Sequence, residues 1–178
     1  MSHVILVDHH DQPIGRCDKV LAHQQGLLHR AFSIFVFRRR VGILELLLQQ
    51  RAATKYHSAG LWSNTCCSHP QAGETTIAAA QRRLEEEFGF TLPLNMIGHF
   101  IYHVELNDGL TEYEFDHVLI GMYDNETIQP DPTEIQAYQW VNAQELISLI
   151  DRNPGQYSAW LREAAMIAIH SLELNFPS

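Results

Sequence analysis

The feature that most constrains this chain is the stretch of residues 62–90, in which a polar loop passes directly into a charged helix. Proline and glycine at Pro70 and Gly73 end any regular structure before the helix. The helix is predicted over residues 74–88, with Glu74 in the first turn, where the helix dipole favours a negative charge. Gly89 follows in the position where glycine commonly ends a helix.

Apolar residues recur at helical spacing along this helix and predict one buried face, made of Ile77, Ala80, Leu84 and Phe88. Arg82 lies one turn from Glu86, and Arg83 lies one turn from Glu87, so ordinary surface pairing can account for some of this charge. That interpretation accounts for the helix. It leaves the two thiols and the imidazole of the preceding loop unexplained.

The end of the stretch resembles the Nudix box, whose pattern is G-x5-E-x7-R-E-U-x-E-E-x-G-U. The matching residues are Glu74, Arg82, Leu84, Glu86, Glu87, Gly89 and Phe90. Two positions depart from the pattern, because Ser68 replaces the opening glycine and Arg83 replaces one carboxylate. In a Nudix pyrophosphohydrolase that carboxylate helps to hold magnesium and activate water. The resemblance implies an α/β fold, a Nudix-like α/β/α sandwich with a mixed sheet, but only a weak hydrolase signal.

The loop itself points elsewhere in this superfamily. Residues 62–74 read W-S-N-T-C-C-S-H-P-Q-A-G-E and are similar to the W-[ST]-N-x-x-C-x-H-P-x-x-G-E loop of type I isopentenyl diphosphate isomerases. These enzymes interconvert isopentenyl and dimethylallyl diphosphate by moving a double bond through a tertiary carbocation. The resemblance extends over residues 18–160, which is most of the chain. It implies the same reaction, in isoprenoid biosynthesis.

Composition sets the broad class of the protein. With 178 residues, 46% of them hydrophobic and 19% charged, the chain is expected to form one globular domain over residues 1–178. A net charge of −9 argues against nucleic acid or an anionic membrane as partner, and no apolar run reaches the length of a membrane span. No basic region precedes the first apolar segment, and three cysteines make a poor disulfide framework. We expect a cytoplasmic monomer or homodimer.

Patterning predicts the elements that flank the loop and helix. Strands are expected at residues 4–7, 16–19, 29–40, 43–50, 96–105, 111–123 and 135–141, and further helices at residues 20–28, 143–150 and 159–172. Turns are expected at residues 11–15, 41–42 and 107–109. Residues 51–71 show no periodicity and are expected to be a long functional loop. The basic run of residues 38–40 is interpreted as a solvated hairpin tip.

Eleven histidines are more than such a chain needs and direct attention to metal ligands. Glu112 and Glu114 lie two residues apart in a predicted strand, so their side chains project from one face. The resemblance implies that these carboxylates share a site with three imidazoles, those of His23, His29 and His69. Three imidazoles and two carboxylates suit a divalent transition metal, manganese or zinc. No flavin is expected.

A small-molecule diphosphate needs local positive charge on so acidic a chain. The positions that match the diphosphate-binding residues of the isomerases are Lys19, Arg51, Lys55 and Arg83. At Arg83 the hydrolase carboxylate becomes a fork for phosphate oxygens. The resemblance also implies that Glu87 and the backbone carbonyl of Cys67 hold a magnesium ion that arrives with the diphosphate.

Moving an unactivated double bond requires an acid on one side, a base on the other and the exclusion of water. Glu114 is the predicted acid, with assistance from Tyr102, and Cys67 is the predicted base. A nearby positive charge favours the thiolate, and His69 lies two residues from Cys67. Trp62 is expected to present its ring to the developing cation, an interaction worth ~2 kcal/mol when desolvated.

Other conspicuous residues receive structural interpretations. Trp160 is expected either to close the pocket over the substrate or to be a core aromatic. Cys66 matches no catalytic position and is expected to be a small buried hydrophobe. His103 and His117 lie on predicted strands and are at most supporting groups.

Two other functions remain open from sequence. A Nudix pyrophosphohydrolase would act on a nucleotide-like diphosphate, but Arg83 and the thiol of Cys67 argue against it. A binding module would sense a diphosphate without chemistry, and would leave the thiol, the paired carboxylates and the histidines idle.

Overall fold

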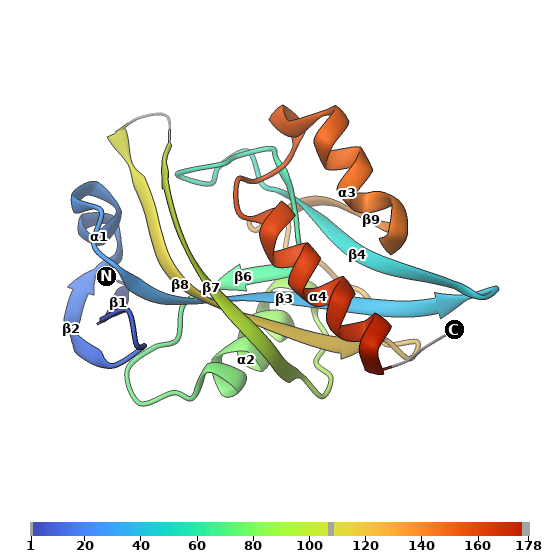
Figure 1. Ribbon diagram of the computed structural model, residues 1–178, viewed down its shortest axis with the longest axis horizontal. Coiled ribbons are helices and arrows are strands. Elements are labelled where there is room, and N and C mark those ends of the chain that lie inside the picture. The colour runs from blue at the N-terminus through green and yellow to red at the C-terminus, as the bar shows by residue number, and fades with distance from the viewer. Residues whose placement is uncertain (1, 107–108, 176–178) are drawn as a thin grey trace.

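The computed structural model describes residues 2–106 and 109–175. Within these ranges the chain forms one mixed sheet with four α-helices around it (Figure 1). In chain order the elements are β1 (His3–Val7), β2 (Pro13–Asp18), α1 (Lys19–Gln25), β3 (His29–Arg40), β4 (Ile43–Arg51), β5 (Trp62–Ser63), β6 (Cys66–Ser68), α2 (Thr76–Phe88), β7 (Asn95–Glu105), β8 (Thr111–Met122), β9 (Ile135–Asn142), α3 (Ala143–Arg152), η2 (Pro154–Gln156) and α4 (Leu161–Asn175). None of these helices has the length and apolar character that crossing a membrane requires.

Strand β3 is the centre of the sheet. It runs parallel to β8, with His29 opposite Glu114 and Phe37 opposite Met122. On its other edge it pairs antiparallel with β4 near its end and with β6 near its middle, where Ser33 lies opposite Cys67. The parallel and antiparallel pairs together confirm the mixed sheet that the sequence predicts.

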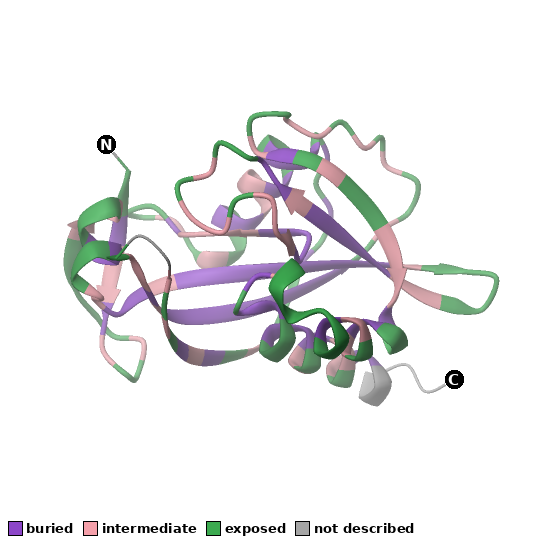
Figure 2. Ribbon diagram, turned by 90° about the horizontal axis from the view of Figure 1, so that it is seen from above, coloured by how far each residue is buried: buried purple, intermediate pink, exposed green. Residues whose placement is uncertain are grey.

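The sheet carries a separate apolar core on each face, and β3 contributes to both. Phe35 and Phe37 pack in the core that also contains residues of α3 and α4. Ile34 and Val36 pack in the core under α2. Because both faces are covered, this strand reads as a nearly continuous apolar run. Figure 2 shows the buried residues gathered in the central strands, between layers whose outer sides are exposed.

Helix α2 begins later than predicted, because Thr75 and not an earlier residue is its N-cap, its side chain accepting from the amide of Ala78 at 3.2 Å. Glu74 therefore precedes the first turn. Gly89 ends the helix with φ +74°, as predicted. Most of the predicted apolar face is buried, but Ile77 is 39% exposed, so its assignment to that face is wrong. Ile77 has the right helical angle but lies in the first turn, where a helix end is less covered.

The expectation of an irregular loop over residues 51–71 is wrong in its second half. Strands β5 and β6 lie there and join the sheet edge-on to β4 and β3. Strands of two and three residues are too short to show a periodic pattern. The expected turn at residues 11–15 is also shorter, because β2 begins at Pro13. Of the expected turn at residues 107–109, residues 107 and 108 lie outside the described ranges.

The other structural interpretations mostly agree with the fold. Cys66 is fully buried in the core under α2. The basic hairpin tip is solvated at residues 39 and 40, but Arg38 is not. Its Nε donates to Glu45 at 2.6 Å, and its guanidinium lies 4.1 Å from the centre of the Trp140 ring.

Candidate active site

A cavity of about 60 Å³ is lined by side chains from the helices α1 and α2, from the four strands β4, β6, β7 and β8, from the loop before β5, and from the segments that follow β6 and precede α4. Most of the residues that the sequence singled out line it: Lys19, Arg51, Lys55, Cys67, His69, Arg83, Tyr102, Glu112, Glu114 and Trp160. Tyr56, His57 and Ser68 line it too, although the sequence analysis did not select them. Residues from both ends of the chain thus converge on one pocket.

Four predicted residues lie outside this lining. His23 and His29 are fully buried directly behind it, and Glu87 is buried beside Arg83. Trp62 lies in β5, where it is partly buried and packs against the core shared with α3 and α4. The structure therefore does not bring the Trp62 ring to the cavity wall.

An imidazole cluster lies at one end of the cavity. One ligand atom each from His23, His29, His69 and Glu114 can be chosen so that all lie within 4.8 Å of one another. His69 Nε2 is 2.8 Å from Glu114 Oε1, and His29 Nε2 is 3.3 Å from the same oxygen. The two short distances match the roughly 3–4 Å that separates ligand atoms of one ion.

The imidazole rings are oriented by the backbone. Nδ1 of His23 contacts the carbonyl of Lys19 at 2.7 Å, and Nδ1 of His29 contacts the carbonyl of Leu27 at 2.8 Å. A carbonyl at Nδ1 fixes the proton there and leaves the lone pair of Nε2 facing inward, which is the usual arrangement of metal-binding histidines. His29 Nε2 is buried and has no hydrogen-bond partner among the described residues. A metal ion would satisfy this atom, so the residues fit the divalent ion that the sequence predicts.

Glu112 lies at the edge of the cluster. Its Oε1 is 3.7 Å from His23 Nε2 and 3.1 Å from Nε2 of His57, a residue that the sequence did not select. Tyr102 bridges the two carboxylates, because its hydroxyl donates to Glu114 at 2.5 Å and to Glu112 at 3.2 Å. The predicted assistance of Glu114 by Tyr102 is thus geometrically available.

The two carboxylates differ in protonation. Burial, reinforced by the charge of Glu114, raises the pKa of Glu112 well above its usual range. Burial acts on Glu114 in the same sense, but the neighbouring imidazoles of His29 and His69 outweigh it and hold the pKa of Glu114 well below its usual range. The pair therefore keeps one proton on Glu112, which Tyr102 connects to Glu114.

Alternation along β6 separates the two adjacent thiols. Cys66 faces the core under α2, whereas Cys67 packs on the opposite face of the sheet. Glu114 lies on the same face as Cys67, in β8, which pairs with the other edge of β3. Arg51 Nη1 lies 3.7 Å from Cys67 Sγ. Cys67 of β6 and Glu114 of β8 therefore line one cavity, and β3 lies between their two strands.

The electrostatics of Cys67 differ from expectation. Burial raises the pKa of Cys67 to about 12, although the charge of Arg51 opposes the shift. Burial also lowers the pKa of His69 to about 3, so this imidazole is neutral near pH 7. The expectation that His69 supplies the positive charge favouring a thiolate is therefore wrong, and Arg51 is the cation beside the sulfur.

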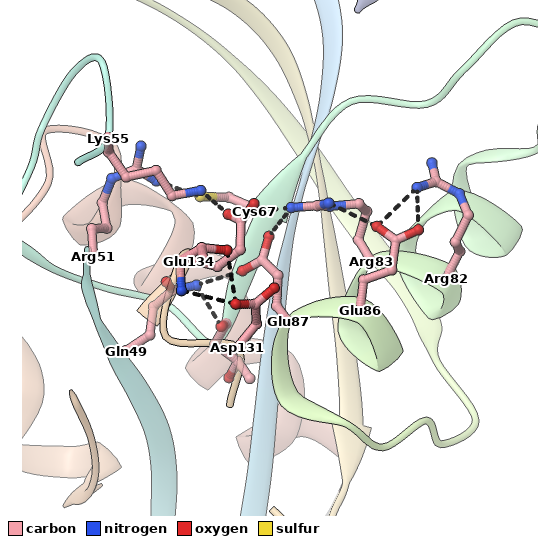
Figure 3. Close-up of polar contacts among 12 residues, drawn as sticks. Gln49, Arg51, Lys55, Cys67, Arg82, Arg83, Glu86, Glu87, Asp131 and Glu134 are labelled. Carbon is pink, nitrogen blue, oxygen red and sulfur yellow. Dashed lines mark hydrogen bonds and ion pairs between the residues drawn. The ribbon is translucent and has the colours of Figure 1, made fainter. Parts of the chain in front are cut away.

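Figure 3 shows three of the predicted phosphate-binding cations, Arg51, Lys55 and Arg83. Arg83 Nη2 is 2.5 Å from Glu87 Oε1 and 3.5 Å from Glu134 Oε2. Lys55 also forms an ion pair with Glu134. Gln49 Nε2 donates a hydrogen bond to Glu87 Oε2 at 3.1 Å and so fixes the second oxygen of this carboxylate. A carboxylate that the sequence did not single out, Glu134, thus contacts two of the four cations.

The sequence of the whole chain settles the family. A family profile described as NUDIX domain matches residues 27–163. The chain is 53% identical over 160 residues to isopentenyl-diphosphate delta-isomerase 2 of Photorhabdus laumondii, covering 90% of this chain and 88% of that protein. It is 49% identical over 157 residues to isopentenyl-diphosphate delta-isomerase of Serratia proteamaculans, covering 88% and 86%. This chain belongs to the isopentenyl-diphosphate delta-isomerase family. The Nudix domain makes up residues 27–163 of the chain.

Solved structures agree on the Nudix fold. A protein of Deinococcus radiodurans superimposes with a TM-score of 0.73 at 19% identity, covering 93% of this chain and 98% of its own. An Ap4A hydrolase of C. elegans superimposes with a TM-score of 0.58 at 20% identity, covering 80% and 96%. At such low identity these likenesses concern the fold alone. The isomerase family membership rests on the sequence relatives.

The residues that sequence reasoning missed share one property, which is the lack of a pattern. Tyr56 and His57 follow Lys55 in an irregular loop, and Glu134 follows a proline-rich stretch. The only available signal was the excess of histidines, and it did not distinguish His57 from the others. His117 pairs with Asp11 at 2.9 Å, away from the isomerase-family cavity.

Proposed function

We propose that this protein interconverts isopentenyl diphosphate and dimethylallyl diphosphate in isoprenoid biosynthesis. The observation that carries the proposal is the placement of Cys67 and Glu114 in one cavity that cations line and an imidazole cluster adjoins. Relatives at about half identity over most of the chain bear the name of this activity. A cytoplasmic location agrees with three free cysteines.

The proposed chemistry is a proton exchange at two carbons. One proton is added to the terminal carbon of the double bond, and another is removed from the carbon two bonds away, so that the double bond moves and no net proton is consumed. Glu114 handles the first proton, with Tyr102 connecting it to the proton on Glu112. Cys67 handles the second. Because the reaction is reversible, the acid of one direction is the base of the other.

The proton distribution in the structure has a consequence for this assignment. Without metal or substrate, burial favours the neutral thiol of Cys67 and the neighbouring imidazoles favour the ionised carboxylate of Glu114, which is the arrangement that follows a turnover in the proposed direction. The forward reaction therefore needs a proton to move from the sulfur to the carboxyl pair before each cycle. Arg51, at 3.7 Å from the sulfur, stabilises the thiolate that this transfer produces.

A divalent transition metal, manganese or zinc, is proposed to be held by His23, His29, His69, Glu112 and Glu114. When bound, it would fix the carboxyl group that transfers the proton and make that group a stronger acid. Glu87 and the backbone carbonyl of Cys67 are proposed to hold magnesium that enters with the diphosphate. Oxygen ligands and substrate phosphates are what magnesium prefers.

The diphosphate is proposed to bind Lys19, Arg51, Lys55 and Arg83. All four are cavity-lining cations, and burial lowers the pKa of Lys19 and of Lys55, which marks both as partly desolvated. Trp160 is 3% exposed and forms an apolar wall for the hydrocarbon. Trp62 lies outside the cavity lining and packs against the neighbouring core, so its contact with the substrate would require a movement on binding.

The proposal is tested by incubating the purified protein, supplied with metal, with isopentenyl diphosphate in deuterated water. Deuterium in recovered dimethylallyl diphosphate is the expected result. The variants Cys67→Ala and Glu114→Gln should each abolish incorporation while retaining a cooperative unfolding transition. Cys66→Ala is the matched control, because it removes the adjacent thiol from the opposite face of the sheet.

Two outcomes would refute the proposal. Binding of isopentenyl diphosphate without exchange would leave a diphosphate-binding module. Release of phosphate from nucleoside diphosphates above background, without exchange, would instead indicate a pyrophosphohydrolase, despite Arg83 in the place of the hydrolase carboxylate.

A further inference from the structure

The loop between β4 and β5 carries an imidazole that the family resemblance does not use. Its backbone is tied to β4, because Arg51 Nη2 donates to the carbonyl of His57 at 3.2 Å and Gln50 Nε2 donates to the carbonyl of Gly60 at 3.0 Å. His57 is therefore held in a definite place and does not sit at the tip of a free loop.

The side chain of His57 points into the imidazole cluster. It is 8% exposed, and its Nε2 lies 3.1 Å from Glu112 Oε1. Its Nδ1 contacts the hydroxyl of Ser58 at 3.3 Å, so the ring is oriented in the same way as those of His23 and His29, with Nδ1 satisfied locally and Nε2 directed inward. The ring also stacks on that of His23, with centroids 5.6 Å apart and an angle of 27°.

The ligand atoms of His57, Glu112 and His23 form a second compact set. One atom from each can be chosen so that all three lie within 4.8 Å of one another. Metal–nitrogen distances of about 2.0–2.1 Å place ligand atoms of one ion roughly 3–4 Å apart. His23 belongs to both sets, so the set of His57 and Glu112 adjoins the proposed metal centre through the ring of His23.

We infer that His57 is a further metal ligand of this site, completing it on the Glu112 side for a divalent transition ion that accepts imidazole and carboxylate. The hydroxyl of Tyr56 lies 3.4 Å from the same nitrogen, His23 Nε2. The inference rests on the proposed metal centre, but it does not depend on isomerase activity.

The direct test follows the histidine ring nitrogens by NMR. Protein labelled with ¹⁵N-histidine is stripped with a chelator and titrated with zinc, and the His57 signals are assigned by their loss in His57→Gln. The expected result is a large shift of His57 Nε2 that saturates at the same zinc-to-protein ratio as the shifts of His23, His29 and His69. If those three shift and His57 Nε2 does not, this inference is wrong and the proposed centre stands. If none shifts, both are wrong.

An affinity measurement separates ligation from a loose contact. Zinc is distributed between the protein and a competing chromophoric chelator, for the parent, for His57→Gln and for His103→Gln. His103 is an exposed histidine of β7 and controls for the loss of any imidazole. Loss of an inner ligand should weaken zinc binding by at least about tenfold in His57→Gln, with the control within twofold of the parent. Equal affinities for the two variants would overturn the inference.

Discussion

The ion pairs of Glu134 predict an unusual gain of function. Glu134 contacts Lys55 and lies 3.5 Å from Arg83 Nη2, and these are two of the cations proposed to bind the diphosphate. An incoming diphosphate must take both cations from this carboxylate. The substitution Glu134→Gln removes the competing charge and keeps the size of the side chain. We therefore expect it to tighten the binding of a polyanion.

The magnitude follows from the depth of the pairs. The side chains of Lys55, Arg83 and Glu134 are 20%, 20% and 25% exposed, so water screens them less than fully exposed surface pairs. Exposed pairs contribute about 0–1 kcal/mol, and two partly buried contacts should together exceed that range slightly. About 1.4 kcal/mol corresponds to a tenfold change in an equilibrium constant. Glu134→Gln should therefore bind inorganic diphosphate about tenfold more tightly than the parent.

The assay is isothermal titration calorimetry with inorganic diphosphate in magnesium-free buffer. Glu86→Gln is the matched control, because Glu86 contacts Arg83 Nη1 at 2.7 Å but is 45% exposed on the outer side of α2. The same charge is removed from the same guanidinium, and the effect should be less than threefold. Equal tightening in both variants would mean that net charge, not displacement, governs binding. Unchanged affinity in Glu134→Gln would refute the reasoning, and a parent that binds no diphosphate would refute the anion site itself.

The remaining predictions concern stability. Gly89→Ala should destabilise the fold by about 1–3 kcal/mol in urea unfolding, because φ is +74° and an added Cβ would lie 3.0 Å from the backbone oxygen of Gln129. Gly73→Ala should cost less, because φ is similar at +85° but no described atom lies within 4 Å of an added Cβ. Equal costs would mean that φ alone matters. In the chelator-treated protein, burial lowers the pKa of His57 to about 2, against about 6.5 in an unfolded chain. The unfolded state therefore binds one more proton than the folded state, and the free energy of unfolding falls as the pH drops below about 6.5. His57→Gln lacks this loss and should gain about 2 kcal/mol relative to the parent between pH 7 and pH 5; parallel stabilities would contradict the assignment. Zinc at one hundred times its dissociation constant should raise the free energy of unfolding by about 2.7 kcal/mol, and no rise in the melting temperature would argue against the metal centre.

The sequence predicted the long elements because their patterns are long. The run from His29 to Arg40 is apolar enough to require cover on both faces, and the helix ending at Gly89 carries its own stop signal. Strands β5 and β6 were missed because two or three residues cannot show a period. Burial of Ile77 was predicted wrongly because helical angle says nothing about where the covering layer ends.

The site could be predicted only as far as the family resemblance reached. The motif residues Cys67 and His69, and the strand pair at Glu112 and Glu114, do meet in space. His57 and Glu134 could not be foreseen, because no local pattern marks them and their importance arises from contacts between distant segments. The protonation of Cys67 was likewise out of reach, since it depends on how deeply the folded chain buries the sulfur.

The pairing of β3 with two neighbours acts as a ruler for the chemistry. His29, at one end of this strand, pairs with Glu114 and fixes its position along the sheet. Ser33, four residues further along β3, pairs with Cys67 and fixes the position of the thiol. Side chains alternate between faces, so a slip by a single residue on either seam would send one of the two proton-transferring groups into the opposite core. An insertion between these two positions of β3 would therefore leave a folded protein that still binds metal but whose acid and base lie on opposite faces of the sheet.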